Sequence, residues 1–185
     1  MNKNNVILIG AVALAFGVIG AMVGINRNEP APLTKVAVPT PDGAPHGAVG
    51  ALYAQTMNDA AGTPQALSKW KGKAMIVNFW APWCAPCVKE MPELAELATE
   101  LGKKDIAVIG IGIDSPSNIA QFAAKIPVSY PLYVAGMSGT DLARQFGNSA
   151  GGLPYTVLIG ADGQVRKTYL GQLKFEELRA DLAKL

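Results

Sequence analysis

The chain has 185 residues, of which 50% are hydrophobic and 16% charged, and its formal net charge is +2 at pH 7. Once an apolar N-terminal segment is set aside, this length suffices for one globular domain with a good core. The sequence has no basic cluster and no phosphate-cradling glycine motif, so it offers no support for binding of nucleic acid or nucleotides.

The N-terminal part of the chain predicts a membrane segment and a tether. Residues 6–25 are twenty uncharged, mostly apolar positions preceded by Lys3, and a run of this length can cross a hydrocarbon core of about 30 Å. We expect residues 1–25 to be an uncleaved anchor, with a cleaved signal peptide as the alternative. Residues 26–47 are rich in proline and alanine and predict a tether without regular structure. The domain would then occupy residues 48–185.

Within the domain, the hydrophobic pattern predicts alternating strands and helices. Strands are expected at residues 51–54, 74–80, 106–113, 130–134, 155–159 and 165–169, the last two joined as a hairpin through Asp162-Gly163. Helices are expected at residues 67–70, after Cys87, and at residues 118–125, 142–146 and 175–185. Ser115 is a plausible N-cap, with Pro116 at the first helical position. The order predicts an α/β fold, a mixed sheet with helices on both faces.

The two cysteines of the chain, Cys84 and Cys87, form a C-x-x-C between the predicted strand 74–80 and a predicted amphipathic helix. A helix N-terminus lowers the pKa of a thiol, because unpaired backbone N–H groups and the helix dipole favour the thiolate. We therefore expect Cys84 to be the nucleophile and Cys87, one turn further in, to be the resolving thiol. Pro86 fits this interpretation, since the first helical turn tolerates proline.

The run from Asn78 to Pro92, NFWAPWCAPCVKEMP, closely resembles the signature of the membrane-anchored TlpA/ResA/DsbE-like reductases of the thioredoxin-like family. The run Gly152-Leu153-Pro154-Tyr155-Thr156 is similar to the G-x-P-x-T strand of that family, and the resemblance extends over residues 48–185. It implies a thioredoxin fold in which residues 114–147 form a TlpA-like central insertion. It also implies a redox-active Cys84–Cys87 disulfide and neither a further cofactor nor a bound metal.

The resemblance assigns three residues to substrate binding. In the family, the proline at the position of Pro154 is cis and packs beside the disulfide, whereas the alternative is a trans proline at a strand edge. The preceding residue, here Leu153, offers its backbone to a substrate strand. Trp83, next to Cys84, is expected to belong to the same surface.

Two further positions bear on proton handling. Thioredoxin carries a buried aspartate where this chain has Asn78, and an asparagine side chain cannot take a proton. Glu90, three residues after Cys87 on nearly the same helix face, matches an acidic residue that the TlpA/ResA-like proteins place near their cysteines. We expect Glu90 to assist proton transfer to or from Cys87, the alternative being a solvated helix glutamate.

The resemblance also implies partners and a location. Such proteins are anchored in the bacterial inner membrane by a single pass, with the catalytic domain in the periplasm. They reduce protein disulfides, either haem-attachment cysteines of apocytochrome c or cysteines of copper-oxidase assembly, with electrons from a membrane reductase of the DsbD/CcdA kind.

Other chemistries remain as alternatives. A disulfide oxidase or isomerase could use the same fold. A structural zinc needs about four ligands, whereas the chain offers two cysteines and one distant histidine, His46. A copper chaperone of the Sco type would carry C-x-x-x-C and a downstream histidine, but copper(I) between two thiolates stays open.

Overall fold

The computed structural model describes residues 44–185. The predicted anchor at residues 1–25 and most of the predicted tether lie outside this range. Among the described residues, none of the helices combines the length and apolar character needed to cross a bilayer.

The centre of the domain is a seven-stranded mixed sheet in the order β2-β1-β5-β4-β3-β6-β7. The parallel neighbours are β3 with β4 and β4 with β5, and the remaining pairs are antiparallel. The mixed sheet expected from the sequence is thus confirmed. The strands are β1 (Thr56–Asp59), β2 (Pro64–Ala66), β3 (Met75–Trp80), β4 (Ala107–Gly112), β5 (Leu132–Val134), β6 (Tyr155–Ile159) and β7 (Val165–Leu170).

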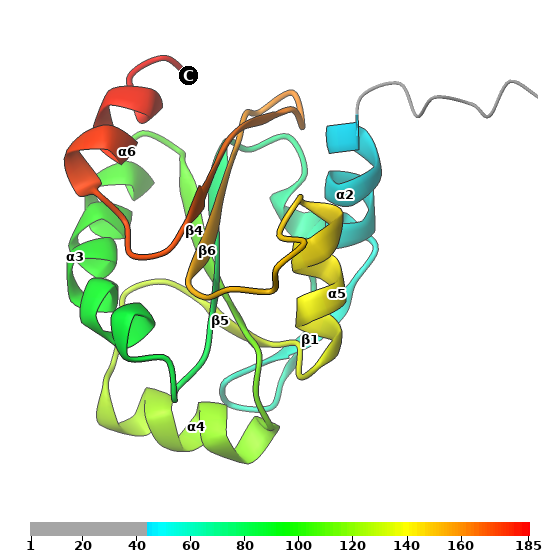
Figure 1. The fold of residues 1–185 in the computed structure, drawn as a ribbon, viewed down its shortest axis with the longest axis vertical. Coiled ribbons are helices and arrows are strands. Elements are labelled where there is room, and N and C mark those ends of the chain that lie inside the picture. Colours follow the sequence, from blue (N-terminus) through cyan, green and yellow to red (C-terminus); the bar gives the residue numbers. More distant parts are fainter. Residues whose placement is uncertain (1–43) are drawn as a thin grey trace, which may run out of the picture. The chain divides into compact units, whose positions relative to one another are not determined.

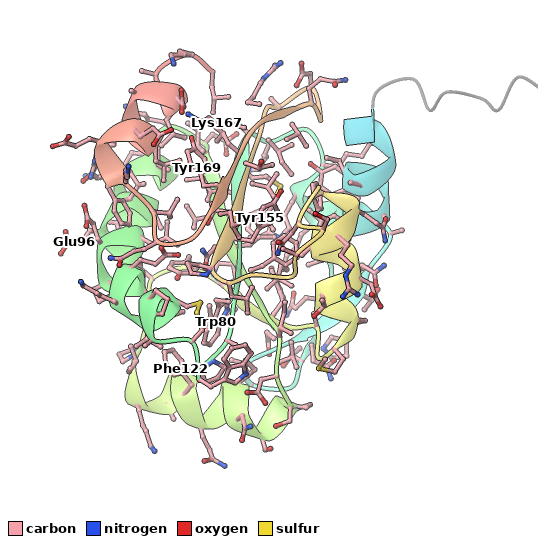
Figure 2. All side chains as sticks on the ribbon, viewed as in Figure 1. Trp80, Glu96, Phe122, Tyr155, Lys167 and Tyr169 are labelled. Atoms are coloured by element: carbon pink, nitrogen blue, oxygen red, sulfur yellow. A yellow bond between two sulfur atoms is a disulfide. The ribbon has the colours of Figure 1, made fainter. Side chains whose placement is uncertain are left out.

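Helices cover both faces of this sheet, as predicted. They are α2 (Ala44–Tyr53), the 3-10 helix η1 (Leu67–Trp70), α3 (Ala85–Gly102), α4 (Pro116–Lys125), α5 (Ser138–Gln145) and α6 (Phe175–Leu182). Figure 1 shows α3 and α6 on one face and α2 and α5 on the other. A separate hydrophobic cluster fills each interface. In Figure 2 the Trp80 ring lies against Phe122 of α4, with ring centroids 4.8 Å apart.

Strand β3 positions the residues before the cysteines. It lies between β4 and β6 and all its residues are buried. Because side chains alternate along a strand, Ile76 and Trp80 enter the cluster beneath α3, and Val77 and Phe79 enter the opposite one. Asn78 has the same parity as Ile76 and Trp80. The one polar side chain of β3 therefore faces α3.

The predicted helix starts are confirmed. Cys84 is the N-cap of α3, and Pro86 lies in its first turn. Ser115 caps α4, accepting a hydrogen bond from the Asn118 N–H at 3.2 Å, and Pro116 is the first helical residue. Pro92 lies inside α3.

Near the start of the domain the structure differs from the sequence prediction in two places. The strand predicted at residues 51–54 is wrong, because residues 51–53 are the end of α2, which begins at Ala44 within the predicted tether. A short apolar run does not distinguish a strand from a buried helix, and here Val49 and Leu52 share a buried helical face. The β1–β2 hairpin was not predicted, because Met57 is its one buried residue.

Candidate active site

Cys84 and Cys87 are joined by a disulfide at the N-terminus of α3. Cys84 has an extended backbone, and its Sγ accepts a hydrogen bond from the Cys87 backbone N–H at 3.3 Å. Cys87 is fully buried, while Cys84 retains 5% of its surface. The more accessible cysteine therefore lies at the helix end, where a negative charge on sulfur is favoured. This geometry suits Cys84 as the nucleophile.

Trp83 directly precedes Cys84, and Leu153 packs against the hydrophobic cluster that contains both cysteines. The Leu153–Pro154 peptide is cis, so the alternative trans proline is wrong. Pro154 is buried and Leu153 half-buried, whereas Trp83 is 69% exposed. Trp83 and Leu153 line one groove of ≈ 460 Å³, which Pro116 and Met137 extend. We call this the Trp83 groove.

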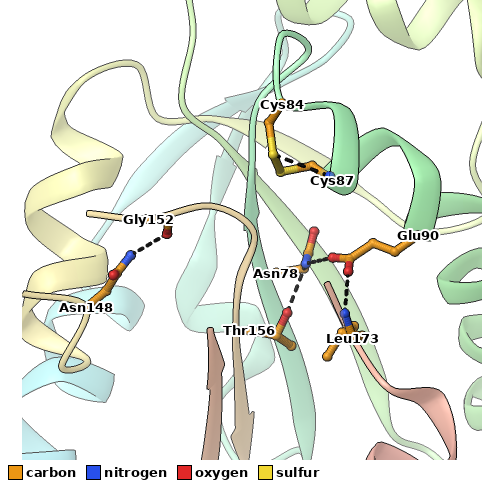
Figure 3. Close-up of a disulfide and its surroundings, with 8 residues drawn as sticks. All are labelled: Asn78, Cys84, Cys87, Glu90, Asn148, Gly152, Thr156 and Leu173. Carbon is orange, nitrogen blue, oxygen red and sulfur yellow. Dashed lines mark hydrogen bonds between the residues drawn. A yellow bond between two sulfur atoms is a disulfide. The ribbon is translucent and has the colours of Figure 1, made fainter. Parts of the chain in front are cut away.

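Glu90 is not a solvated helix residue, since its exposed fraction is 1%. Its Oε1 accepts a hydrogen bond from Asn78 Nδ2 at 2.9 Å, and its Oε2 accepts one from the Leu173 backbone N–H at 2.8 Å. Asn78 Nδ2 also donates to Thr156 Oγ1 at 3.0 Å. Figure 3 shows this chain of contacts below the disulfide. We call Asn78, Glu90, Thr156 and the Leu173 amide the buried polar cluster.

The environment of Glu90 disfavours its charge. Burial raises the pKa of the Glu90 carboxyl, and the hydrogen bonds from Leu173 and Asn78 offset part of that rise. Burial also raises the pKa of the nearby Tyr130 hydroxyl, and the charge of Glu90 raises it further. A buried carboxyl with a raised pKa is suited to exchanging protons with a neighbouring group.

The structure brings together most of the residues singled out from the sequence. Cys84, Cys87 and Glu90 lie on the buried side at the start of α3, where Asn78 contacts Glu90. Pro86 is exposed on the first turn of the same helix. The described residues hold no group of three or more histidine, cysteine, aspartate or glutamate side chains that could bind a metal ion.

Two members of the buried polar cluster were missed from the sequence. Thr156 carries a weak signal, since it follows Pro154 on a strand that pairs with β3, directly opposite Asn78. The Leu173 contact is made by a backbone amide, so no residue type could have indicated it.

A profile of the redoxin family matches residues 35–182. The chain belongs to the redoxin family. It is 30% identical over 129 residues to the thiol-disulfide oxidoreductase ResA of Geobacillus thermodenitrificans, an alignment that covers 68% of this chain and 71% of the relative. The ResA of Bacillus cereus is 32% identical over 130 residues, with 70% and 73% covered.

Solved structures agree with this assignment to the redoxin family. A putative thiol:disulfide interchange protein DsbE from Chlorobium tepidum has a TM-score of 0.62 at 22% identity, covering 70% of this chain and 91% of that one. An exposed lipoprotein thioredoxin of Streptococcus pneumoniae has a TM-score of 0.61 at 25% identity, covering 71% and 98%. The fold is thioredoxin-like, and this redoxin is a thiol-disulfide oxidoreductase of the ResA/DsbE type. The resemblance drawn from the sequence is confirmed.

Proposed function

We propose that this redoxin reduces protein disulfides in the bacterial periplasm, tethered to the inner membrane by residues 6–25. Its substrates would be cysteine pairs of apocytochrome c or of copper-oxidase assembly, and a membrane reductase of the DsbD/CcdA kind would return electrons to it. The observation that carries the proposal is the position of Cys84 at the N-terminus of α3, with the buried Glu90 one turn beyond Cys87.

The reaction follows from this arrangement. The Cys84 thiolate attacks the substrate disulfide, a Cys84–substrate bond forms, and the first substrate sulfur leaves and takes up a proton. Cys87 then loses its proton and attacks Cys84 Sγ. The Cys84–Cys87 disulfide forms, and the second substrate sulfur departs with the electron pair of the mixed disulfide.

Glu90 is the proposed acceptor for the Cys87 proton. Each of its carboxylate oxygens accepts one hydrogen bond and keeps lone-pair capacity for a proton. When a reductant regenerates the dithiol, the same carboxyl returns the proton to Cys87. Burial raises the pKa of the carboxyl toward that of a thiol, so that the proton can pass in either direction.

The Trp83 groove is the proposed docking surface for the substrate segment. Trp83 and Met137 are both largely exposed, and exposed apolar side chains next to a reactive group favour binding of a partner. Leu153 lines the groove and also packs against the hydrophobic cluster that contains Cys84 and Cys87. A flexible segment with an apolar side chain near its cysteine fits this surface.

The reduction potential of Cys84–Cys87 tests the direction of electron flow. The protein would be equilibrated in defined thiol redox buffers, with tryptophan fluorescence as the readout and the Cys87→Ser variant as the control without a disulfide. A value near or below about −230 mV supports a reductase, and one near about −120 mV would make it an oxidase. Failure to observe a reversible two-electron transition would favour the copper(I)-binding alternative.

Membrane tethering needs its own experiment. The full chain and a variant lacking residues 6–25, exported by a cleavable leader, would be expressed in a bacterium with a periplasm. We expect the full chain in the membrane pellet after alkaline extraction and the shortened chain in the periplasmic extract. Equal release of both from the pellet would contradict the anchor.

A further inference from the structure

The carboxamide of Asn78 has one end without a partner. Asn78 is fully buried, and its Nδ2 donates to both Glu90 and Thr156. Its Oδ1 is one of the few buried side-chain atoms of the described residues without a hydrogen bond. In this orientation the amide nitrogen donates to Glu90 Oε1, and the carbonyl end of the amide points away from the carboxylate. A buried carbonyl oxygen without a donor is costly and calls for an explanation.

The position of Asn78 Oδ1 explains why it has no donor. Asn78 projects from β3 toward α3, and Cys87 lies one turn before Glu90 on the buried side of that helix. Figure 3 shows the free oxygen on the side of the carboxamide where the Cys84–Cys87 disulfide lies. In the disulfide neither sulfur carries a hydrogen, so neither can donate. The reduced protein has a thiol S–H that could donate to this carbonyl oxygen, and the oxidised protein does not.

We propose that Asn78 Oδ1 accepts a hydrogen bond from the Cys87 thiol in the dithiol form. Reduction breaks the Sγ–Sγ bond, the two electrons come from the dithiol that is oxidised in exchange, and one of the two protons taken up resides on Cys87 Sγ. That S–H is the donor missing from the oxidised protein. This inference deepens the proposed function, on whose dithiol chemistry it rests.

Asn78 is then a positioning residue for Cys87. Its oxygen holds the resolving thiol in the protonated form, and its nitrogen holds the carboxylate of Glu90 at the other end of the same amide. Because the amide does not titrate, it cannot compete for the proton that Cys87 releases. An aspartate at this position would be a third titrating group. The asparagine leaves Glu90 as the acceptor.

The hydrogen bond makes a prediction about the redox equilibrium. Asn78→Leu removes the acceptor from the dithiol form and removes the buried unpaired oxygen from the disulfide form. Both changes favour the disulfide. The equilibrium constant for exchange with a reference dithiol should shift toward the disulfide by about three- to tenfold, the range expected for one modest hydrogen bond.

The matched control is Thr156→Val, which removes the other partner of Asn78 Nδ2 and leaves Oδ1 in place. It alters both redox forms alike and should shift the exchange constant by less than about twofold, well below one hydrogen bond. Both substitutions are repeated in the Glu90→Gln protein, so that an effect transmitted through the carboxylate is removed. If Asn78→Leu shifts the equilibrium no more than Thr156→Val in that background, the proposal is wrong.

A second measurement needs no substitution. In full-length protein carrying a ¹³C label in asparagine carboxamides, the Asn78 carbonyl signal should move on reduction, because its oxygen gains a donor. A signal that does not move on reduction would show that the bond does not form and would overturn the proposal. This test remains available even if Asn78→Leu does not fold. A reduction potential in the oxidant range would refute the reductase function, but the effect of Asn78→Leu and the movement of the carbonyl signal would remain. Failure of the proposed function is therefore distinguishable from failure of the proposed hydrogen bond.

Discussion

Two carboxylates on the same side of the sheet, Glu90 of α3 and Asp181 of α6, show how differently one chemical group can be held. Glu90 accepts hydrogen bonds from neutral donors in a dry site, and its pKa is raised by burial. Asp181 accepts from Lys167, Lys184 and the Tyr169 hydroxyl at 2.7, 2.7 and 2.9 Å. These partners hold the pKa of Asp181 well below its usual range. Figure 2 labels Lys167 and Tyr169 beside α6.

The difference teaches that hydrogen bonding alone does not set the pKa of a carboxylate. Both carboxylates are well bonded, yet the neighbouring cations and the access to water decide the direction of the pKa. Burial raises the pKa of Glu90 above its usual value, which suits this carboxyl to proton exchange. Asp181 stays ionised and ties β7 to α6, which is a structural role.

The largest expected effect is on catalysis. Glu90→Gln should lower the disulfide-reductase rate near neutral pH by about 100-fold, the lower end of what proton transfer contributes. Asp181→Asn and Glu93→Gln, the latter on the exposed side of the same helix, should leave the rate near that of the unchanged protein. Stopped-flow reduction of a model disulfide across pH measures this. An unaltered pH profile in Glu90→Gln would end the catalytic interpretation of Glu90.

The next effect is on stability. Thr156→Val leaves the buried Asn78 Nδ2 with one acceptor fewer, and an unsatisfied buried donor costs about 1–3 kcal/mol. Tyr169→Phe deletes a hydroxyl from the Asp181 network, where Lys167 and Lys184 still satisfy the carboxylate, and should cost less. Urea unfolding of the oxidised proteins compares them. A larger loss of unfolding free energy for Tyr169→Phe than for Thr156→Val would mean that the Asp181 network, not the buried polar cluster, depends more on each hydrogen bond.

The pH dependence of stability should carry opposite signs for the two acids. Because folding raises the pKa of Glu90, its contribution is fully present below the unfolded value of about 4.3 and is lost as pH rises through the folded value. As pH rises from about 4 to about 7, the free energy of unfolding of Glu90→Gln should therefore increase relative to that of the unchanged protein. Urea titrations at several pH values test this. A constant difference across that window would mean that Glu90 has no raised pKa.

The smallest effect is expected at Asp181. Its lowered pKa stabilises the fold above the unfolded value of about 3.9, and this contribution is lost as pH falls through the folded value. Asp181→Asn should therefore weaken the protein most near neutral pH and little in strong acid, and added salt should reduce the difference. Thermal unfolding of Asp181→Asn and the unchanged protein, at several pH values and at low and high salt, measures this difference. A loss that persists in strong acid would point to packing instead of charge.

Much of the fold could be predicted because its signals are local. The apolar stripe after Cys87, the Ser115-Pro116 cap and the Asp162-Gly163 hairpin each depend on residues close together in the sequence, and each is confirmed. The errors fall where local signals are short or weak. The segment 51–54 was too short to show the helical spacing of apolar residues in α2. The β1–β2 hairpin buries too few side chains to show the alternation of apolar and polar residues that marks a strand.

The sequence by itself determined the dithiol, its helix and the side of that helix on which Glu90 lies, because C-x-x-C and the spacing of Glu90 from Cys87 are properties of one continuous segment. Only the tertiary structure decided what surrounds Glu90. Asn78, Thr156 and Leu173 meet there although the contacts join positions 12, 78 and 83 residues apart. Their meeting depends on strand register and chain packing, which also exclude water and so raise the pKa of Glu90.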